Sequence, residues 1–200
     1  MRQLILASAS PRRRQLLGLL NIGFQVIPAR GEEVLGTQDP AQAVKDLSRQ
    51  KAGEVAEWVD QEAVIIGADT VVALGGEILG KPESREHAFA MLLKLQGNIH
   101  SVFTGVTLLE KDRQSIIQSR TFVEETRVSV GPMTERQIWD YINREESMDK
   151  AGAYAIQGPF GVFIQGITGD YNNVVGLPLS RLYREFLEMG IDPLEEWKTV

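Results

Sequence analysis

The chain has 200 residues, 43% of them hydrophobic and 24% charged, and it contains no cysteine. This composition is typical of a globular protein, excludes a disulfide-stabilised miniprotein, and suits a reducing cytoplasm, where we expect the protein to lie. No apolar run approaches the roughly 20 residues of a membrane-spanning helix, so we expect no membrane partner. The net charge of −6 argues against duplex nucleic acid as a partner.

The first part of the chain alternates strand-like and helix-like runs. Gln3–Ser8 is a short apolar strand, and Ser10 is placed to cap a helix that begins at Pro11 and ends near Leu20. Four further segments are predicted in chain order: a strand at Phe24–Pro28, a polar loop at Gly31–Asp39, a helix at Pro40–Val59 and a buried strand at Ala63–Ala68.

The remaining segments add a hairpin and two long strands. The Gly75-Gly76 pair between Val71–Leu74 and Glu77–Leu79 is typical of a two-residue hairpin turn. Six elements follow: a helix at Glu83–Leu95, strands at Ser101–Glu110 and Ser115–Val130, a helix opened by the capping box Thr134–Gln137, a strand at Val162–Ile167 and a last helix at Pro178–Met189. This order predicts an α/β protein with a mixed sheet and a cleft between two lobes.

Positive charge is concentrated near the start of the chain. Residues 1–30 contain five arginines and no carboxylate. Arg12 and Arg13 stand in the first turn of a helix, where the helix dipole favours acidic side chains. With the free N–H groups of that turn and the hydroxyls of Ser8 and Ser10, they would form a pocket for an anion with several oxygens, such as a phosphate chain. The alternative is that both arginines point into solvent.

A lysine interrupts an apolar helix face. Lys51 shares a stripe with Val44, Ser48, Val55 and Trp58 at helical spacing. Either its ammonium reaches water while its stem packs, or it meets a phosphate group in a cleft beside the sheet.

An acid and a second lysine flank the hairpin. Asp69 stands where the apolar run Ala63–Ala68 ends, which suits metal binding or base chemistry, although a structural turn cap is the alternative. Lys81 follows the Gly75-Gly76 turn. The spacing from Gly75 to Gly80-Lys81 imitates a P-loop, but position 82 is proline rather than the Ser or Thr that a P-loop needs for Mg²⁺.

Several motifs together resemble one known family. They are Leu-Ile-Leu-Ala-Ser-Ala-Ser-Pro-Arg-Arg at 4–13, Glu32-Glu33, Lys51-Ala52, Ile-Gly-Ala-Asp-Thr-Val-Val at 66–72, Gly80-Lys81-Pro82, Asp-Lys-Ala-Gly-Ala-Tyr-Ala-Ile-Gln-Gly at 149–158 and Val-Gly-Leu-Pro-Leu at 175–179. In this order they resemble the Maf family of septum-formation-related nucleoside triphosphate pyrophosphatases. The resemblance implies one domain over residues 1–200, a fold like that of inosine triphosphate pyrophosphatases, a cytoplasmic homodimer, and hydrolysis of a nucleoside triphosphate with Mg²⁺ or Mn²⁺.

The resemblance also implies roles for individual residues. Asp69 would be the proton acceptor, and Arg12, Thr70 and Gln157 would stand at positions associated with substrate choice, in the pattern of the branch that acts on dTTP and UTP. The branch that acts on 7-methyl-GTP usually has an aromatic residue at the position of Arg12 and glutamine at that of Thr70. Gly31, before Glu32-Glu33, departs from the bulkier residue that is common in the family.

These roles combine into a chemical hypothesis. Glu33, with Asp69, would hold the divalent cation through carboxylate oxygens, while Arg12, Arg13, Lys51 and Lys81 would neutralise the phosphates. The Gln157 amide can pair with O4 and N3–H of uracil or thymine, and when turned over it can also pair with cytosine. The alternatives are hydrolysis of 7-methyl-GTP and a regulator of septum formation that binds nucleotide without turnover.

Overall fold

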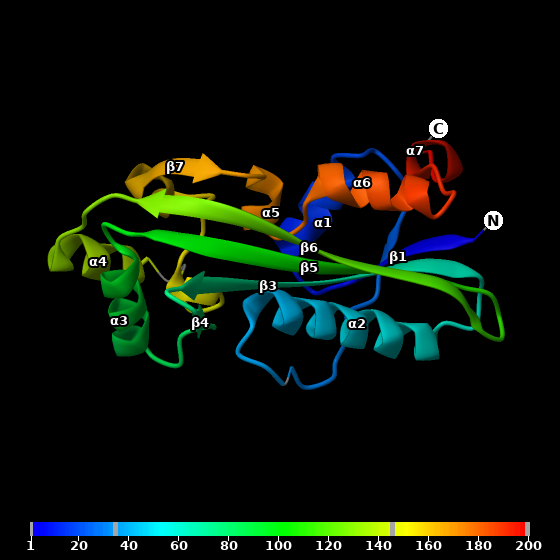
Figure 1. Ribbon diagram of the computed structural model, residues 1–200, viewed down its shortest axis with the longest axis horizontal. Helices are drawn as coiled ribbons and strands as arrows, with labels where there is room; N and C mark the ends of the chain where they lie inside the picture. The colour runs from blue at the N-terminus through cyan, green and yellow to red at the C-terminus, as the bar shows by residue number, and fades with distance from the viewer. Residues whose placement is uncertain (1, 34–35, 145–146, 199–200) are drawn as a thin grey trace.

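The computed structural model describes residues 2–33, 36–144 and 147–198 and contains a seven-stranded mixed sheet (Figure 1). The strand order is β2-β1-β3-β5-β6-β7, with β4 paired to β3 off this path. β2, β1 and β3 run parallel, and all other pairings are antiparallel. The strands are β1 Gln3–Ala7, β2 Gln25–Val26, β3 Ala63–Leu74, β4 Glu77–Leu79, β5 Ile99–Lys111, β6 Ile116–Val130 and β7 Ile164–Thr168. The predicted mixed-sheet α/β class is confirmed.

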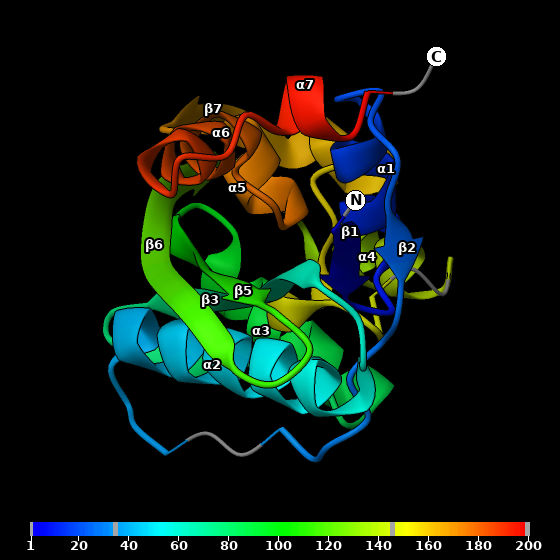
Figure 2. The ribbon, with the colours of Figure 1, turned by 90° about the vertical axis from the view of Figure 1, so that its right-hand side faces the viewer.

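Helices cover both faces of this sheet. They are α1 Pro11–Gly18, α2 Pro40–Trp58, α3 Arg85–Leu95, α4 Glu135–Ile142, α5 Tyr171–Val175, α6 Leu179–Glu188 and α7 Pro193–Glu196, with 3-10 turns at Ala151–Ala153 and Pro159–Phe163. Helix α2 lies along one face, whereas α1, α5 and α6 lie on the other (Figure 2). Among the described residues, no helix combines the length and apolar character needed to cross a membrane.

Of three buried apolar clusters, two form the two lobes of the molecule, and the third lies between α2 and the sheet. One joins β1, α1 and α6 and includes Leu17 and Phe186. The other lies at the opposite end, where α3 and α4 pack together, and includes Leu92 and Ile138. The long strand β5 contributes to both clusters and connects the lobes (Figure 1).

Helices α1, α2, α3 and α4 each begin directly after a capping residue whose side chain accepts a backbone hydrogen bond. Ser10, Asp39 and Ser84 each accept a hydrogen bond from a backbone N–H in the first turn of the following helix. Thr134 forms the predicted reciprocal capping box with Gln137. Ser84 was not predicted as a cap, and α3 begins at Arg85 rather than at Glu83. The other caps act over only two or three residues, which explains why the sequence predicts them well.

Three predictions about the elements are corrected. The buried strand does not end at Ala68, because β5 pairs with β3 as far as Ala73, and Asp69 therefore lies within the strand. Trp58 is 45% exposed rather than buried; it ends α2, where Arg30 lies over its ring. The last strand starts at Ile164 rather than Val162, because a 3-10 turn occupies the preceding residues. Residues 34–35 of the predicted polar loop lie outside the described residues.

His100 makes the stability of the fold depend on pH. Its side chain is 2% exposed, Nε2 lies 2.7 Å from the Tyr154 hydroxyl, and Nδ1 has no partner within the described residues. Burial lowers the pKa of His100 from 6.5 to about 4. Below pH 6.5 the imidazole of His100 is therefore protonated in the unfolded chain but stays neutral in the folded protein. The free energy of unfolding falls as the pH drops from 6.5 towards 4.

We expect His100→Gln to remove this part of the pH dependence. Between pH 7.5 and 4.5 the wild-type protein should lose about 2 to 3 kcal/mol more unfolding free energy than the variant, as measured by urea denaturation. His87, the other histidine of the chain, is exposed, and His87→Gln is the matched control that should behave as the wild type. Equal losses in the wild type and in His100→Gln would contradict this prediction.

Candidate functional site

A cavity of about 550 Å³ opens at the edge of β3. The parallel neighbour β1 ends at Ala7, opposite Gly67, and β4 joins only at Val72. Between these pairings, residues 68–71 have no strand on that side among the described parts of the chain, while β5 pairs with them on the other. Side chains from both faces of β3 can therefore reach the cavity, and Asp69 lies just beyond the end of the parallel pairing rather than at the end of its own strand.

All ten residues that the sequence singled out line this cavity. They are Ser8, Ser10, Arg12, Arg13, Glu33, Lys51, Asp69, Thr70, Lys81 and Gln157. They come from the end of β1, the first turn of α1, the loop before α2, α2 itself, β3, and two later loops. Lys81 and Gln157 are exposed, whereas Asp69 is buried. The geometry brings the residues together; their individual roles stay predictions.

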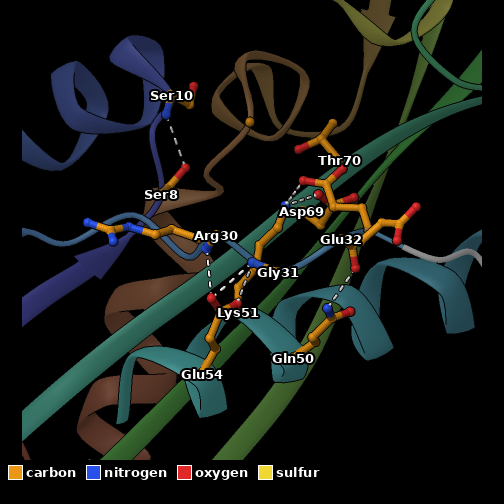
Figure 3. A network of polar contacts seen from close by, with 12 residues as sticks. Ser8, Ser10, Arg30, Gly31, Glu32, Gln50, Lys51, Glu54, Asp69 and Thr70 are labelled. Atoms are coloured by element: carbon orange, nitrogen blue, oxygen red, sulfur yellow. Dashed lines mark hydrogen bonds and ion pairs between the residues drawn. The ribbon is translucent and has the colours of Figure 1, made fainter. Parts of the chain in front are cut away.

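Lys51 joins the two carboxylates of the cavity. Its Nζ lies 2.5 Å from Oδ1 of Asp69 (Figure 3). The same atom lies 2.7 Å from Oε1 of Glu33. Partial burial acts to raise the pKa of Glu33, but the hydrogen bond and charge of Lys51, with Lys81 and Arg13, outweigh it and hold that pKa below its usual value. Glu33 is therefore ionised at neutral pH, and the three side chains form an ammonium bridged by two carboxylates.

Helix α2 fixes the loop that carries Glu33. Oε1 of Glu54 accepts hydrogen bonds from the backbone N–H of Arg30 at 2.8 Å and of Gly31 at 2.9 Å. Nε2 of Gln50 donates to the carbonyl of Glu32 at 2.9 Å (Figure 3). A Cβ at position 31 would lie 2.8 Å from Oε2 of Glu54, so glycine there lets the Glu54 carboxylate approach the backbone. Sequence reasoning missed these two anchors, and the unusual glycine was the signal that could have found them.

Arg13 is held at three points on the opposite wall. Its Nε donates to the carbonyl of Gly176 at 2.8 Å, and its two terminal nitrogens donate to Ser8 at 3.2 Å and Thr70 at 2.9 Å. Burial lowers the pKa of Arg13, an effect that the Asp69 charge opposes. A guanidinium has five N–H donors, so two remain for a ligand while the other three fix its orientation.

Two carboxylates of the cavity could supply part of the coordination shell of a divalent cation. Within the described residues no group of three or more acidic or histidine side chains could enclose a metal ion. Glu33 and Asp69 nevertheless direct oxygens at one positively charged atom, Nζ of Lys51. Mg²⁺ commonly uses one or two protein carboxylates and completes its shell with phosphate oxygens and water. These two residues could hold such an ion.

The sequence did not predict that residues 149–154 form part of the cavity wall. Asp149, Lys150 and Tyr154 line the cavity, and Asp149 forms an ion pair with Lys150. The sequence showed this stretch as rich in glycine, and Gly152 has φ +67°, which turns the chain past Val72 on β3.

In sequence, the chain is similar to a family model and to proteins from several bacteria. The family model described as Maf-like protein matches residues 3–189. A dTTP/UTP pyrophosphatase of Agathobacter rectalis is 48% identical over 204 residues, covering 96% of this chain and 100% of that protein. A dTTP/UTP pyrophosphatase of Geobacillus sp. strain WCH70 is 50% identical over 191 residues, covering 95% and 100%. A solved nucleoside-triphosphatase, also described as a dITP/XTP pyrophosphatase, from Mycobacterium abscessus gives a TM-score of 0.42 at 14% identity and covers 66% of this chain and 75% of its own.

The family match spans residues 3–189, and the residues singled out from the sequence that line the cavity all lie within it. The chain therefore belongs to the Maf family.

Proposed function

We propose that this protein hydrolyses UTP and dTTP to the nucleoside monophosphate and pyrophosphate. The observation that carries the proposal is the composition of the cavity wall, where Arg12, Arg13, Lys51 and Lys81 accompany the carboxylates of Glu33 and Asp69. A cavity of this size lies in the usual range for small-molecule sites. The dTTP/UTP pyrophosphatases that match this chain over their full length support the same reaction.

The positive side chains would bind the phosphates and the developing negative charge of the leaving group. Arg12 and Arg13 stand at the start of α1, where backbone N–H groups add to their charge. Lys51 and Lys81 reach the cavity from α2 and from the loop after β4. Groups fixed in place before the reaction stabilise a charged transition state without having to reorganise.

Asp69 would accept the proton of the attacking water. The water oxygen forms a bond to the α-phosphorus, the bond from that phosphorus to its bridging oxygen breaks, and pyrophosphate leaves. The Lys51 contact holds the Asp69 carboxylate at 2.5 Å and limits its freedom to turn. A divalent cation, Mg²⁺ or Mn²⁺, held by Glu33 and Asp69 would supply Lewis-acid chemistry to the phosphate oxygens.

Gln157 would read the base. It lies at the exposed rim of the cavity, and its amide offers one donor and one acceptor to the O4 and N3–H of uracil or thymine. The homodimer, the cytoplasmic location and a link to septum formation rest on the family resemblance and stay predictions.

A substrate panel tests the proposal. Purified protein is mixed with UTP, dTTP, CTP, GTP and 7-methyl-GTP, and pyrophosphate and orthophosphate are measured separately. We expect pyrophosphate from UTP and dTTP, loss of activity on chelation with EDTA, and recovery with Mg²⁺ or Mn²⁺. Orthophosphate as the product, turnover of 7-methyl-GTP alone, or binding without turnover would each contradict the proposal.

A further inference from the structure

A chain of hydroxyl groups runs from the cavity into the interior. Thr70 on β3 lies in register with Thr104 on β5, and their Oγ1 atoms are 2.9 Å apart. Thr104 is fully buried, and its Oγ1 donates to the backbone carbonyl of Asn173 at 3.0 Å. The Thr70 Oγ1 also contacts a terminal nitrogen of Arg13 at 2.9 Å.

The hydrogens in this chain can be assigned by counting. A hydroxyl has one hydrogen to donate and two lone pairs, whereas a carbonyl can only accept. The Thr104 hydrogen is therefore directed at Asn173, and Thr104 must accept from Thr70. The Thr70 hydroxyl hydrogen is therefore donated to Thr104, and one lone pair of the Thr70 oxygen accepts from Arg13. Towards the cavity, Thr70 has only one lone pair left.

Ser8 has the opposite arrangement. Its Oγ accepts from the backbone N–H of Ser10 at 3.3 Å and from Arg13 at 3.2 Å. Both lone pairs are thereby occupied, and its hydrogen is the part left for a ligand. Two hydroxyls on either side of one guanidinium thus differ in polarity: Ser8 can only donate, and Thr70 can only accept.

We propose that Thr104 is a positioning residue that acts through Thr70. By fixing the Thr70 hydrogen, Thr104 makes the cavity wall there accept a hydrogen bond from a sugar hydroxyl of the nucleotide, since the ring N–H of the pyrimidine is assigned to Gln157. A phosphate oxygen, which can only accept, is directed to Ser8 instead. This inference rests on the proposed function and adds which part of the substrate each wall takes.

The first test compares three variants in steady-state pyrophosphate release with UTP. Thr104→Val keeps the side-chain shape and removes the hydroxyl, so we expect the KM to rise about tenfold, the value of one hydrogen bond, with a smaller change in kcat. Thr104→Ser restores the hydroxyl and should restore the KM. A Thr104→Val variant with the KM of the wild type would overturn the proposal.

Thr107 offers a matched control on the same strand. It is as buried as Thr104, and its hydroxyl contacts Ser48 and Thr121 rather than the cavity network. Thr107→Val should lower the unfolding free energy to a similar extent while it leaves the KM unchanged. An equal rise of the KM in Thr107→Val would mean that Thr104 is merely structural.

Substrate analogues then identify the hydrogen that Thr70 accepts. The probes are dUTP and 3′-deoxy-UTP, each of which lacks one sugar hydroxyl, and the control is N3-methyl-UTP, which lacks the hydrogen assigned to Gln157. We expect one of the two deoxy analogues to lose about tenfold in kcat/KM with the wild type, and this loss to shrink in Thr104→Val, where the freed Thr70 hydroxyl can turn its hydrogen towards the cavity. A loss with dUTP or 3′-deoxy-UTP identifies the sugar hydroxyl, whereas the loss with N3-methyl-UTP reports on Gln157 and should be the same in the wild type and in Thr104→Val.

Full turnover of both deoxy analogues by the wild type, or a loss with one of them that persists unchanged in Thr104→Val, overturns the polarity assignment. A failure of the proposed function is distinguishable, because the wild-type protein itself would then release no pyrophosphate from UTP. A failure of the present inference leaves the wild type active and Thr104→Val unchanged.

Discussion

Asp69→Asn should reduce the kcat for UTP by on the order of 10² to 10⁴-fold, the usual range for loss of a general base. The amide keeps the size of the buried side chain, but it cannot accept the proton of the attacking water. Nucleotide affinity should survive, because Arg12, Arg13 and Lys81 remain on the cavity wall. Single-turnover pyrophosphate release gives the rate, and calorimetric titration with UTP gives the affinity.

Asp46→Asn is the control for this prediction. Asp46 is an exposed carboxylate on the same helix as Lys51, it pairs with Arg49, and it does not line the cavity. Its amide variant should keep the wild-type rate. An Asp69→Asn enzyme with full activity would refute the role of Asp69 as a base, and a parallel loss of affinity would mean that Asp69 acts mainly as a ligand of the cation.

Gly67→Ala should destabilise the protein by about 3 kcal/mol, the upper part of the range for overpacking a core. A Cβ at position 67 would lie 2.2 Å from the carbonyl oxygen of Ser48 and 2.8 Å from the backbone nitrogen of Ala52, both in α2. Backbone atoms cannot rotate away as a side chain can, so the whole helix would have to shift from the sheet. Because α2 carries Lys51, the variant should also lose activity. Urea denaturation and pyrophosphate release measure the two effects.

Gly53 provides the opposite result on the same helix. No atom lies within 4 Å of a Cβ added there, so Gly53→Ala should be neutral or stabilise the protein by up to about 1 kcal/mol through helix propensity. A Gly67→Ala protein as stable as Gly53→Ala would show that α2 can move without cost. Gly105 on β5 has the same constraint, since its Cβ would lie 2.3 Å from the carbonyl oxygen of Val44.

The candidate site was largely visible in the sequence, and the reason is local. Arg12 and Arg13 conflict with the helix dipole, and Lys51 interrupts an apolar stripe, so each was conspicuous among its own neighbours. Such conflicts between local rules and residue type mark functional positions. The family resemblance supplied Glu33, Thr70 and Gln157, which no local rule distinguishes.

By itself, the sequence determined the features that depend on neighbouring residues: the helix starts at Ser10, Asp39 and Thr134, the glycine hairpin turn, and the mixed α/β class. Capping and turn geometry involve atoms only two to four positions apart, so their signals lie within a short stretch of chain.

Only the tertiary structure decided where β3 ends, that Glu54 anchors the loop of Glu33, and that Thr104 stands behind Thr70. Gly31 and Glu54 are 23 residues apart along the chain, and Thr70 and Thr104 are 34 residues apart. Such contacts arise from the register between β3 and β5 and from the close approach of α2, and no periodicity within one segment encodes either. For this reason the sequence predicts that a strand ends before Asp69. In the structure Asp69 lies within β3, after the pairing with β1 ends and before the pairing with β4 begins.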